Sequence, residues 1–410
     1  MTMNANARPA TTAVGVVGAG TMGTGIAQIA ATAGWQVMLA DLDADFVRRQ
    51  VAGIRKNLDR LVEKGRLDAA ARDAAMARIH VAAGPADFSS AELVIEAVVE
   101  DMSAKCAALR PVVAAAPAAI IASNTSSLSI SKLGAALGVA SRAVGMHFFN
   151  PVPLMPLVEV IAGSESDAAA VERVFAVAQQ WGKTAVRAKD SPGFIVNRVA
   201  RGYYLESLRM LGEGVAGVDE IDRTLKTLGG FRMGPFELMD LIGIDVNYSV
   251  SVSVWEQLGR PARLTPHELQ KQLFEAGRFG RKTKRGFYSY EGESPLPATC
   301  VARASFALPP KLYEAVRRVC ERATEASGSQ TEQYVFARVL AAIINEAALL
   351  VDEGIATAAD VDTAMKLGTN YPRGPLEWAE RIGRHTCAAL LRALNEQAGD
   401  GRFRPAAGLA

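Results

Sequence analysis

A histidine and a glutamate twelve residues apart, His147 and Glu159, each lie in a short apolar stretch typical of a buried strand. Neighbouring strand ends can bring two such side chains into hydrogen-bond contact. A carboxylate bound to one imidazole nitrogen fixes the tautomer and makes the other nitrogen a better general base. The pair therefore suits the oxidation of an alcohol. Taken alone, it is more typical of a structural histidine and a surface glutamate.

A glycine-rich loop upstream favours the catalytic interpretation of His147 and Glu159 over the structural one. The loop Gly18-Ala19-Gly20-Thr21-Met22-Gly23 lies between a predicted strand at Val14–Val17 and a predicted helix at Thr24–Thr32. The absent side chains let the backbone turn tightly and approach a pyrophosphate, whose charge then lies at a helix N-terminus. The alternative interpretation is a tight turn in an α/β protein that binds no nucleotide.

An acidic residue follows the next predicted strand, Gln36–Ala40. This residue, Asp41, can accept hydrogen bonds from the ribose hydroxyls of an adenosine, and its charge would repel a 2′-phosphate. The order of strand, loop, helix, strand and acid favours NAD over NADP. Together with His147 and Glu159, it predicts an NAD-dependent dehydrogenase.

The rest of the N-terminal half alternates between helical and strand patterns. A long, charged helical stretch is predicted from Asp43 to about Ala77, followed by buried strands at Leu93–Val98, Ile120–Ser123 and Ala143–Met146. Strands that alternate with helices indicate a doubly wound parallel sheet of the Rossmann type. We expect an NAD-binding α/β domain over residues 1–193.

The pattern becomes helical after the Asp190-Ser191-Pro192-Gly193 segment. We expect an all-α catalytic domain at 194–290, a linker with a leading helix at 291–330, and a second all-α domain at 331–410. The linker prediction rests on a stretch rich in Pro, Ser and Gly with little periodicity.

The second all-α domain repeats the first. Residues 198–243 align with 338–383 at a constant offset of 140, and 13 of the 46 aligned positions are identical, several times what chance would give. Asn197 corresponds to Ala337, so one polar group occurs only in the first copy.

Further polar residues fit either a ligand or an ordinary structural role. The hydroxyls of Ser123-Asn124-Thr125-Ser126-Ser127 follow a strand, where they can hold a substrate oxygen or cap the helix that begins near Ser129. Asn197 can contact the same ligand or cap a helix. A basic stretch can meet an anionic ligand or form a solvated helix face; it contains Arg48, Arg49, Arg55, Lys56, Arg60, Lys64 and Arg66.

Composition excludes several other classes of protein. The 410 residues carry a net charge of +2, without the basic excess of a nucleic-acid binder. The four cysteines include no CxxC pair, so neither a metal site nor a disulfide framework is indicated. No apolar run reaches the ~18 residues of a membrane span. Residues 1–12 resemble a disordered tail rather than a signal, so we expect a cytoplasmic protein.

Several motifs together resemble those of the L-3-hydroxyacyl-CoA dehydrogenases, over about Val14 to Tyr290. The motifs are Gly18-Ala19-Gly20-Thr21-Met22-Gly23-Thr24-Gly25-Ile26-Ala27, Glu96-Ala97-Val98-Val99-Glu100, Ser123-Asn124-Thr125-Ser126-Ser127-Leu128, His147-Phe148-Phe149-Asn150-Pro151, Pro192-Gly193-Phe194-Ile195-Val196-Asn197-Arg198 and Gly234-Pro235-Phe236-Glu237-Leu238.

The resemblance implies oxidation of an (S)-3-hydroxyacyl-CoA to the 3-oxoacyl-CoA by NAD⁺. His147 would be the base and Glu159 its partner, while Ser126 and Asn197 would position the reacting oxygen and the thioester. It places family NAD contacts in the glycine loop and at Asp41, Glu100, Lys105, Asn124, Ser126, Asn150 and Lys282. It places CoA contacts at Asn57 and Lys64.

The duplicated tail, with the motif at 366–375, resembles bacterial members that include the 3-hydroxyadipyl-CoA dehydrogenases of aromatic catabolism. Two-domain relatives pair through their helical domains. We therefore expect residues from about Thr331 to Gly383 to cover that face in place of a second subunit, giving a monomer or a homodimer. Two other functions stay open: a dehydrogenase of a free hydroxy acid or sugar acid, and a non-catalytic NAD-binding scaffold protein.

Overall fold

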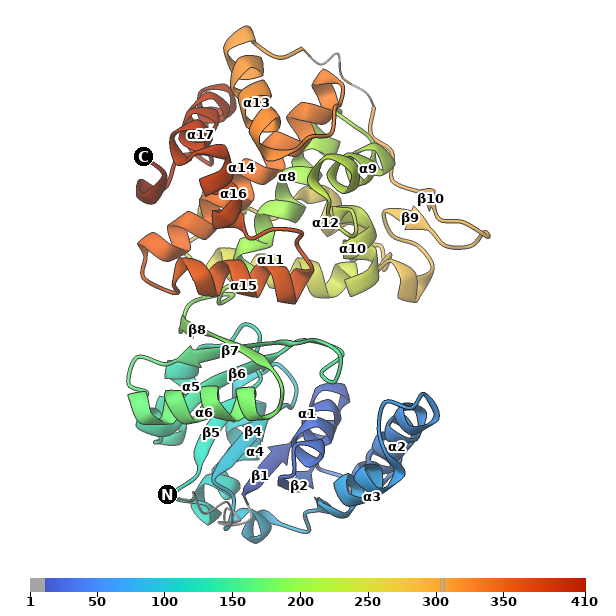
Figure 1. The fold of residues 1–410 in the computed structure, drawn as a ribbon, viewed down its shortest axis with the longest axis vertical. Coiled ribbons are helices and arrows are strands. Elements are labelled where there is room, and N and C mark those ends of the chain that lie inside the picture. Colours follow the sequence, from blue (N-terminus) through green and yellow to red (C-terminus); the bar gives the residue numbers. More distant parts are fainter. Residues whose placement is uncertain (1–11, 303, 305–306) are drawn as a thin grey trace, which may run out of the picture. The chain divides into compact units, whose positions relative to one another are not determined.

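The computed structural model describes residues 12–302, 304 and 307–410, so the tail predicted at 1–12 lies outside the described residues except for Thr12. The chain forms two compact units, Met1–Ser191 and Pro192–Ala410 (Figure 1). The first is an α/β unit. The second contains both helical copies, which pack together as one body.

An eight-stranded sheet forms the centre of the first unit. Its strands are β1 (Ala13–Val17), β2 (Gln36–Ala40), β3 (Ile79–Val81), β4 (Leu93–Glu96), β5 (Ile120–Ser123), β6 (Ala143–Phe148), β7 (Leu157–Ala162) and β8 (Thr184–Lys189). Their order is β3-β2-β1-β4-β5-β6-β7-β8. Neighbours run parallel except β6 and β7, which are antiparallel. The predicted Rossmann-type α/β class is confirmed.

The helices of the first unit cover both faces of this sheet. They are α1 (Thr21–Thr32), α2 (Ala44–Glu63), α3 (Ala69–Ala77), α4 (Met102–Ala115), α5 (Ile130–Leu137) and α6 (Ala168–Gln180). The helical stretch predicted from Asp43 to about Ala77 consists of two helices, α2 and α3. The chain adopts a left-handed conformation at Gly65, with φ of 63°, and α3 starts anew after its N-cap Asp68.

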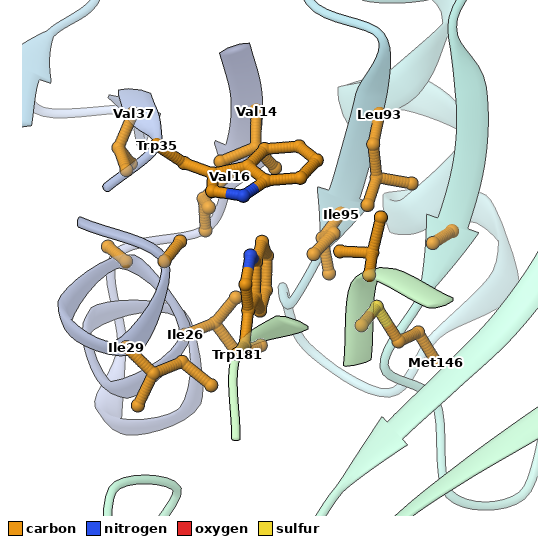
Figure 2. Packing of buried hydrophobic residues seen from close by; sticks show 14 of the residues in the cluster. Val14, Val16, Ile26, Ile29, Trp35, Val37, Leu93, Ile95, Met146 and Trp181 are labelled. Carbon is orange, nitrogen blue, oxygen red and sulfur yellow. The ribbon is translucent and has the colours of Figure 1, made fainter. Parts of the chain in front are cut away.

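Double coverage explains the strand sequences. All five residues of β1 are buried, as expected for a central strand with helices on both faces. The edge strand β8, in contrast, mixes exposed and buried positions. On one face, Trp35 and Trp181 meet edge to face at 5.5 Å and fill the space between α1 and the sheet (Figure 2).

The second unit is predominantly helical. Its helices are α7 (Val196–Val199), α8 (Arg201–Gly212), α9 (Val218–Gly229), α10 (Pro235–Ile242), α11 (Ile244–Gln257), α12 (Glu268–Glu275), α13 (Pro310–Ala323), α14 (Gln330–Asp352), α15 (Ala358–Thr369), α16 (Pro375–Ile382) and α17 (Arg384–Ala398). A two-stranded hairpin of β9 (Tyr288–Ser289) and β10 (Leu296–Pro297) reaches into the segment expected to be a linker.

The repeat in the sequence is visible as a repeat in structure. Helices α9 to α11 and α15 to α17 begin at positions related by the same offset of 140. In the first copy, Asp222 accepts hydrogen bonds from the backbone N–H groups of Phe236 and Glu237 at the start of α10. Asp362 does the same at the start of α16. The two copies therefore share their capping chemistry as well as their helices.

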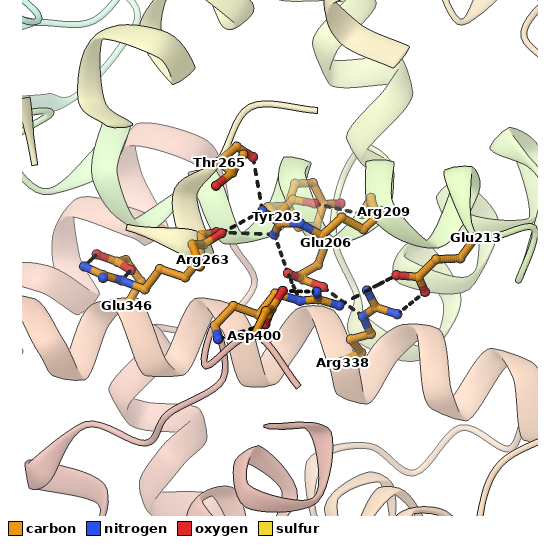
Figure 3. Close-up of polar contacts among 12 residues, drawn as sticks. Tyr203, Glu206, Arg209, Glu213, Arg263, Thr265, Arg338, Glu346 and Asp400 are labelled. Atoms are coloured by element: carbon orange, nitrogen blue, oxygen red, sulfur yellow. Dashed lines mark hydrogen bonds and ion pairs between the residues drawn. The ribbon is translucent and has the colours of Figure 1, made fainter. Parts of the chain in front are cut away.

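Reciprocal ion pairs join α7 and α8 of the first copy to α14 of the second. Arg198 donates to Glu346 at 2.7 Å. Arg338 donates to Glu206 at 2.8 Å (Figure 3). Each arginine also binds a second carboxylate of the other copy through both terminal nitrogens; these carboxylates are Glu353 and Glu213. Each copy thus supplies the counter-charges of the other.

Helix α14 is long and apolar enough to cross a membrane by length and composition. It is 83% buried in its most apolar window, and it packs against α8, α9, α13 and α16. It is the central helix of the second unit.

Candidate active site

The antiparallel register of β6 and β7 places His147 directly opposite Glu159. The imidazole Nδ1 lies 2.6 Å from the Glu159 Oε2. Glu159 is fully buried and His147 is 6% exposed, so neither the surface glutamate nor an isolated structural histidine describes the pair. The strand pairing fixes both side chains before any ligand binds.

A carboxylate can only accept, so Nδ1 carries the proton in this contact and Nε2 carries the lone pair. Asn124 steadies the strand next to the histidine, because its Oδ1 accepts from the backbone N–H of Phe148 at 2.9 Å. The geometry gives an imidazole of fixed tautomer whose Nε2 can accept a proton. This is the arrangement of a general base.

The glycine loop fits a pyrophosphate at the N-terminus of α1. Gly18 has φ of 104°, and a Cβ there would lie 2.5 Å from the Ala97 carbonyl oxygen. A Cβ at Gly23 would lie 1.8 Å from the Gly18 carbonyl oxygen. A Cβ at Gly20, in contrast, would meet no described protein atom within 4 Å. Gly18 and Gly23 are therefore required by the packing of the protein, whereas Gly20 borders open space that a ligand can approach.

Asp41 lies exposed at the end of β2. Its Oδ2 accepts from the backbone N–H of Ala19 in the glycine loop at 2.7 Å, and its Oδ1 accepts from the N–H of Leu42 at 2.7 Å. The carboxylate therefore ties the loop to the second strand. It stays accessible for further hydrogen bonds.

Glu100 gathers the polar residues that follow β5. One of its oxygens accepts from the hydroxyl of Thr125 at 2.7 Å and from the backbone N–H groups of Ser126 and Ser127 at 2.8 and 3.0 Å. Burial alone would raise the pKa of Glu100, but Lys105 and these hydrogen bonds outweigh burial and lower it to about 2. The hydroxyl of Ser126 also donates to Glu100, at 3.2 Å.

A second, fully buried carboxylate lies beneath Glu100. Glu96 accepts from the Lys105 ammonium at 2.8 Å and from the Ser123 hydroxyl at 2.6 Å. The same ammonium lies 3.2 Å from Glu100, and the Lys105 side chain is 1% exposed. Lys105 therefore supports the strand ends from below, and its predicted contact with NAD stays a prediction.

The predicted helix cap at Ser123–Ser127 was wrong. Helix α5 is capped by Ser129, whose hydroxyl accepts from the N–H of Lys132. The hydroxyls of Ser123 and Thr125 instead bind Glu96 and Glu100. These polar residues therefore stabilise the carboxyl ends of β4 and β5.

The other candidates of the first unit lie on its surface. Asn150 follows β6 and is exposed, and Ser126 is half-buried. Asn57 lies on α2 and Lys64 at its C-terminal end, both exposed, on the same helix as most of the basic stretch.

Asn197 and Lys282 belong to the second unit. Asn197 lies in the short helix α7 and is half-buried. Lys282 lies in a 3₁₀ turn, Arg281–Thr283, and its ammonium forms an ion pair with Asp245 at 2.6 Å. Both residues are therefore placed by elements of the helical unit.

Two family profiles cover most of the chain. The profile of the 3-hydroxyacyl-CoA dehydrogenase NAD-binding domain matches residues 13–191, and that of the 3-hydroxyacyl-CoA dehydrogenase C-terminal domain matches residues 193–290 and 334–409. The chain belongs to the 3-hydroxyacyl-CoA dehydrogenase family. It is an NAD-dependent oxidoreductase of that family, and the second profile match covers the repeat.

The dehydrogenase is similar to proteins of Escherichia coli along almost its whole length. It is 34% identical to a 3-hydroxyadipyl-CoA dehydrogenase of Escherichia coli, over 96% of this chain and 95% of that one. A solved structure of 3-hydroxybutyryl-CoA dehydrogenase from Escherichia coli superposes with a TM-score of 0.87 at 33% identity, over 98% of both chains. A shorter 3-hydroxybutyryl-CoA dehydrogenase of Bradyrhizobium diazoefficiens is 42% identical over 69% of this chain and 97% of its own.

The role of Glu96 in this dehydrogenase was not predicted from the sequence. A carboxylate at the end of the buried strand β4 was a usable signal, since buried charges need partners. Lys105, Ser123 and the backbone N–H of Val98 all donate to it. Glu96 is thus the internal anchor of the polar cluster around Glu100.

Proposed function

We propose that this chain oxidises the 3-hydroxyl of an (S)-3-hydroxyacyl-CoA to give the 3-oxoacyl-CoA. The observation that carries the proposal is the buried hydrogen bond between His147 and Glu159, 2.6 Å long, in the same unit as a glycine loop shaped for a dinucleotide. A non-catalytic NAD-binding protein has no need to bury an ionisable pair in this way, which disfavours that alternative.

The Nε2 atom of His147 accepts the proton of the substrate hydroxyl. The hydride leaves from the carbon that carries this hydroxyl. Bound NAD⁺ supplies the acceptor for that hydride. Glu159 stabilises the imidazolium that results, because its carboxylate faces the protonated Nδ1 at close range. In this proposal, Ser126 and Asn197 contact the substrate and hold the reacting oxygen and the thioester in place.

The residues of the first unit suit NAD. The N-terminus of α1 faces the open space beside Gly20, where backbone N–H groups can bind a pyrophosphate. Asp41 can accept from ribose hydroxyls, and its charge disfavours a 2′-phosphate. Glu100 and Asn150 are the further contacts that we propose around the nicotinamide half. Lys282 is the contact that we propose from the second unit.

Two exposed residues of α2 and its end fit the CoA portion of the substrate. Lys64 supplies a cation for the CoA phosphates, and Asn57 lies on the exposed surface of the same helix. This cation favours a CoA ester over a free hydroxy acid as the substrate, because a free hydroxy acid has no phosphates. We propose a cytoplasmic location, as suits an enzyme of soluble CoA esters.

We also propose that the second helical copy takes the place of a partner subunit, so that the chain works as a monomer or dimerises through another surface. The reciprocal arginine–glutamate pairs support this, since they form the kind of isologous contact that joins identical subunits. Sedimentation equilibrium tests it. A dimer that dissociates when α8 is altered would contradict it.

A panel of 3-hydroxyacyl-CoA thioesters, followed by NADH absorbance, tests the proposed reaction. The panel varies chain length and includes a substrate with a terminal carboxylate, which decides between 3-hydroxybutyryl-CoA and 3-hydroxyadipyl-CoA as the preferred class. Free 3-hydroxy acids serve as the control. Equal turnover of the free acids would refute the role of CoA, and no turnover of any substrate would refute catalysis.

A further inference from the structure

A buried arginine lies directly behind the helix that carries Asn197. Arg201 is 3% exposed, and its Nε donates to the backbone carbonyl of Asn197 at 2.9 Å. Its Nη1 donates to the hydroxyl of Ser251 at 2.8 Å and to the backbone and side-chain oxygens of Asn247 at 3.1 and 3.3 Å. One guanidinium thus joins α7 to α11.

This cation has no ionic partner. Within the part of the chain that the structure describes, no carboxylate lies within ion-pair distance of Arg201, in contrast to Arg198 and Arg338. The ring of Tyr204 lies 4.9 Å from the guanidinium carbon, and the buried Tyr371 also acts on its charge. Burial lowers the pKa of Arg201, so the protein maintains this cation at a cost in free energy.

The second helical copy shows that the fold does not require this cluster. Helices α11 and α17 begin at Ile244 and Arg384, so the offset of 140 continues through them. The positions equivalent to Arg201, Asn247 and Ser251 are Ala341, Cys387 and Leu391. All three are buried, at 3%, 2% and 0% exposed, in the same helical arrangement.

The second copy lacks both the Arg201 cluster and an asparagine at the position that corresponds to Asn197. Where the first copy has Asn197, the second has Ala337. The second copy keeps the helices, the capping aspartate and the interlocking arginine, yet it lacks all four polar groups. It therefore shows which residues the packing of these helices requires. The buried cation is therefore retained for something other than folding.

We propose that Arg201 is a positioning residue that, held by Asn247 and Ser251, sets the place of Asn197 for the reaction. The inference rests on the proposed function, because it assigns Asn197 a contact with the substrate. The physical reason is that a helix of four residues has little rigidity of its own. A guanidinium held by four acceptor atoms on three residues removes that freedom. Small misplacements of a positioning group are costly in rate.

The test replaces the cluster with the residues of the second copy, as the triple variant Arg201→Ala, Asn247→Cys and Ser251→Leu. The leucine makes up most of the volume that the arginine loses, so the core should stay filled. We expect a melting temperature only modestly below that of the wild type, because the buried Gln270 amide loses the Asn247 oxygen to which it donates at 2.8 Å. We expect unchanged NADH affinity by fluorescence titration. We expect kcat to fall by ~10²-fold.

A double-mutant cycle with Asn197→Ala separates positioning from a general effect. If Arg201 acts through Asn197, the triple substitution should lower kcat only slightly further in a protein that already carries Asn197→Ala. A wild-type kcat in the triple variant would refute the proposal, as would fully additive effects or a large fall in melting temperature. Failure of the wild-type protein itself to oxidise any 3-hydroxyacyl-CoA would refute the proposed function instead.

Discussion

Gly202 of α8 lies against the backbone of Ala342 of α14, and the two positions are equivalents in the repeat. A Cβ at Gly202 would lie 3.1 Å from the Ala342 carbonyl carbon. A residue that meets its own counterpart marks the pseudo-twofold axis between the copies. The reciprocal pairs of Arg198 and Arg338 lie on either side of it.

We expect Gly202→Leu to lower the free energy of unfolding by ~1–3 kcal/mol, because backbone atoms of α14 cannot move aside as a side chain can. The same substitution at Gly53 in α2 is the control, since a Cβ there meets no described atom within 4 Å. Leucine at Gly53 should stabilise its helix. Equal changes in urea-unfolding midpoint for both variants would show that the close approach at Gly202 is unimportant.

Removing the proposed base should separate binding from chemistry. We expect His147→Gln to reduce kcat by ~10²–10⁴-fold or more while NADH affinity stays close to wild type. Glu159→Gln should also lower kcat strongly, because the amide cannot stabilise an imidazolium as a carboxylate does. Stopped-flow turnover and NADH fluorescence measure the two effects. Loss of NADH binding in either variant would mean that the residue serves the fold.

Asp41 should govern the choice of cofactor. Asp41→Ala removes the acceptors for the ribose hydroxyls, the repulsion of a 2′-phosphate and the bond to the N–H of Ala19. We expect a higher KM for NAD and a smaller preference over NADP, measured as the ratio of kcat/KM values. A wild-type enzyme that prefers NADP would overturn the assignment.

The interlocked arginines predict a specific response to acid. Burial would raise the pKa of Glu206, but Arg209 and Arg338 outweigh burial and lower it to about 2, from the usual 4.5. The contribution of Glu206 to the free energy of unfolding is therefore complete above about pH 4.5 and is lost as the pH falls toward 2.

We accordingly expect Glu206→Gln to destabilise the protein by ~3–5 kcal/mol at neutral pH, because it leaves buried arginines without their counter-charge. The variant should also lose part of the acid sensitivity of the wild type. Glu353→Gln is the matched control: Glu353 also pairs with a buried arginine, but its side chain is 44% exposed, so its loss should cost less. Denaturation at several pH values provides the comparison.

Much of the first unit could be predicted because its signals are local. The glycine loop, the acid after β2 and the strand patterns each depend on a few neighbouring residues. The contact of His147 with Glu159 was also within reach, since both lie in short apolar strands. The antiparallel direction of β6 and β7 was not, because it depends on the path of the chain between them.

The helical unit was less accessible to prediction. The offset of 140 revealed the duplication, but the exchange of ion pairs between copies depends on how α8 and α14 cross. Nothing near Arg201 in the sequence distinguishes it from the partnered Arg198 three residues earlier. The difference appears only when the neighbours from α11 and α14 are in place.

The exchanged ion pairs also set an order of events during synthesis. A ribosome releases Arg198 well before Glu346 and Glu353 have been made, so the first copy emerges with an arginine whose carboxylate partners both belong to the second copy. Since domains fold as units during translation, the α/β unit can complete its core first. The helical unit can complete its core only after α14 has left the exit tunnel.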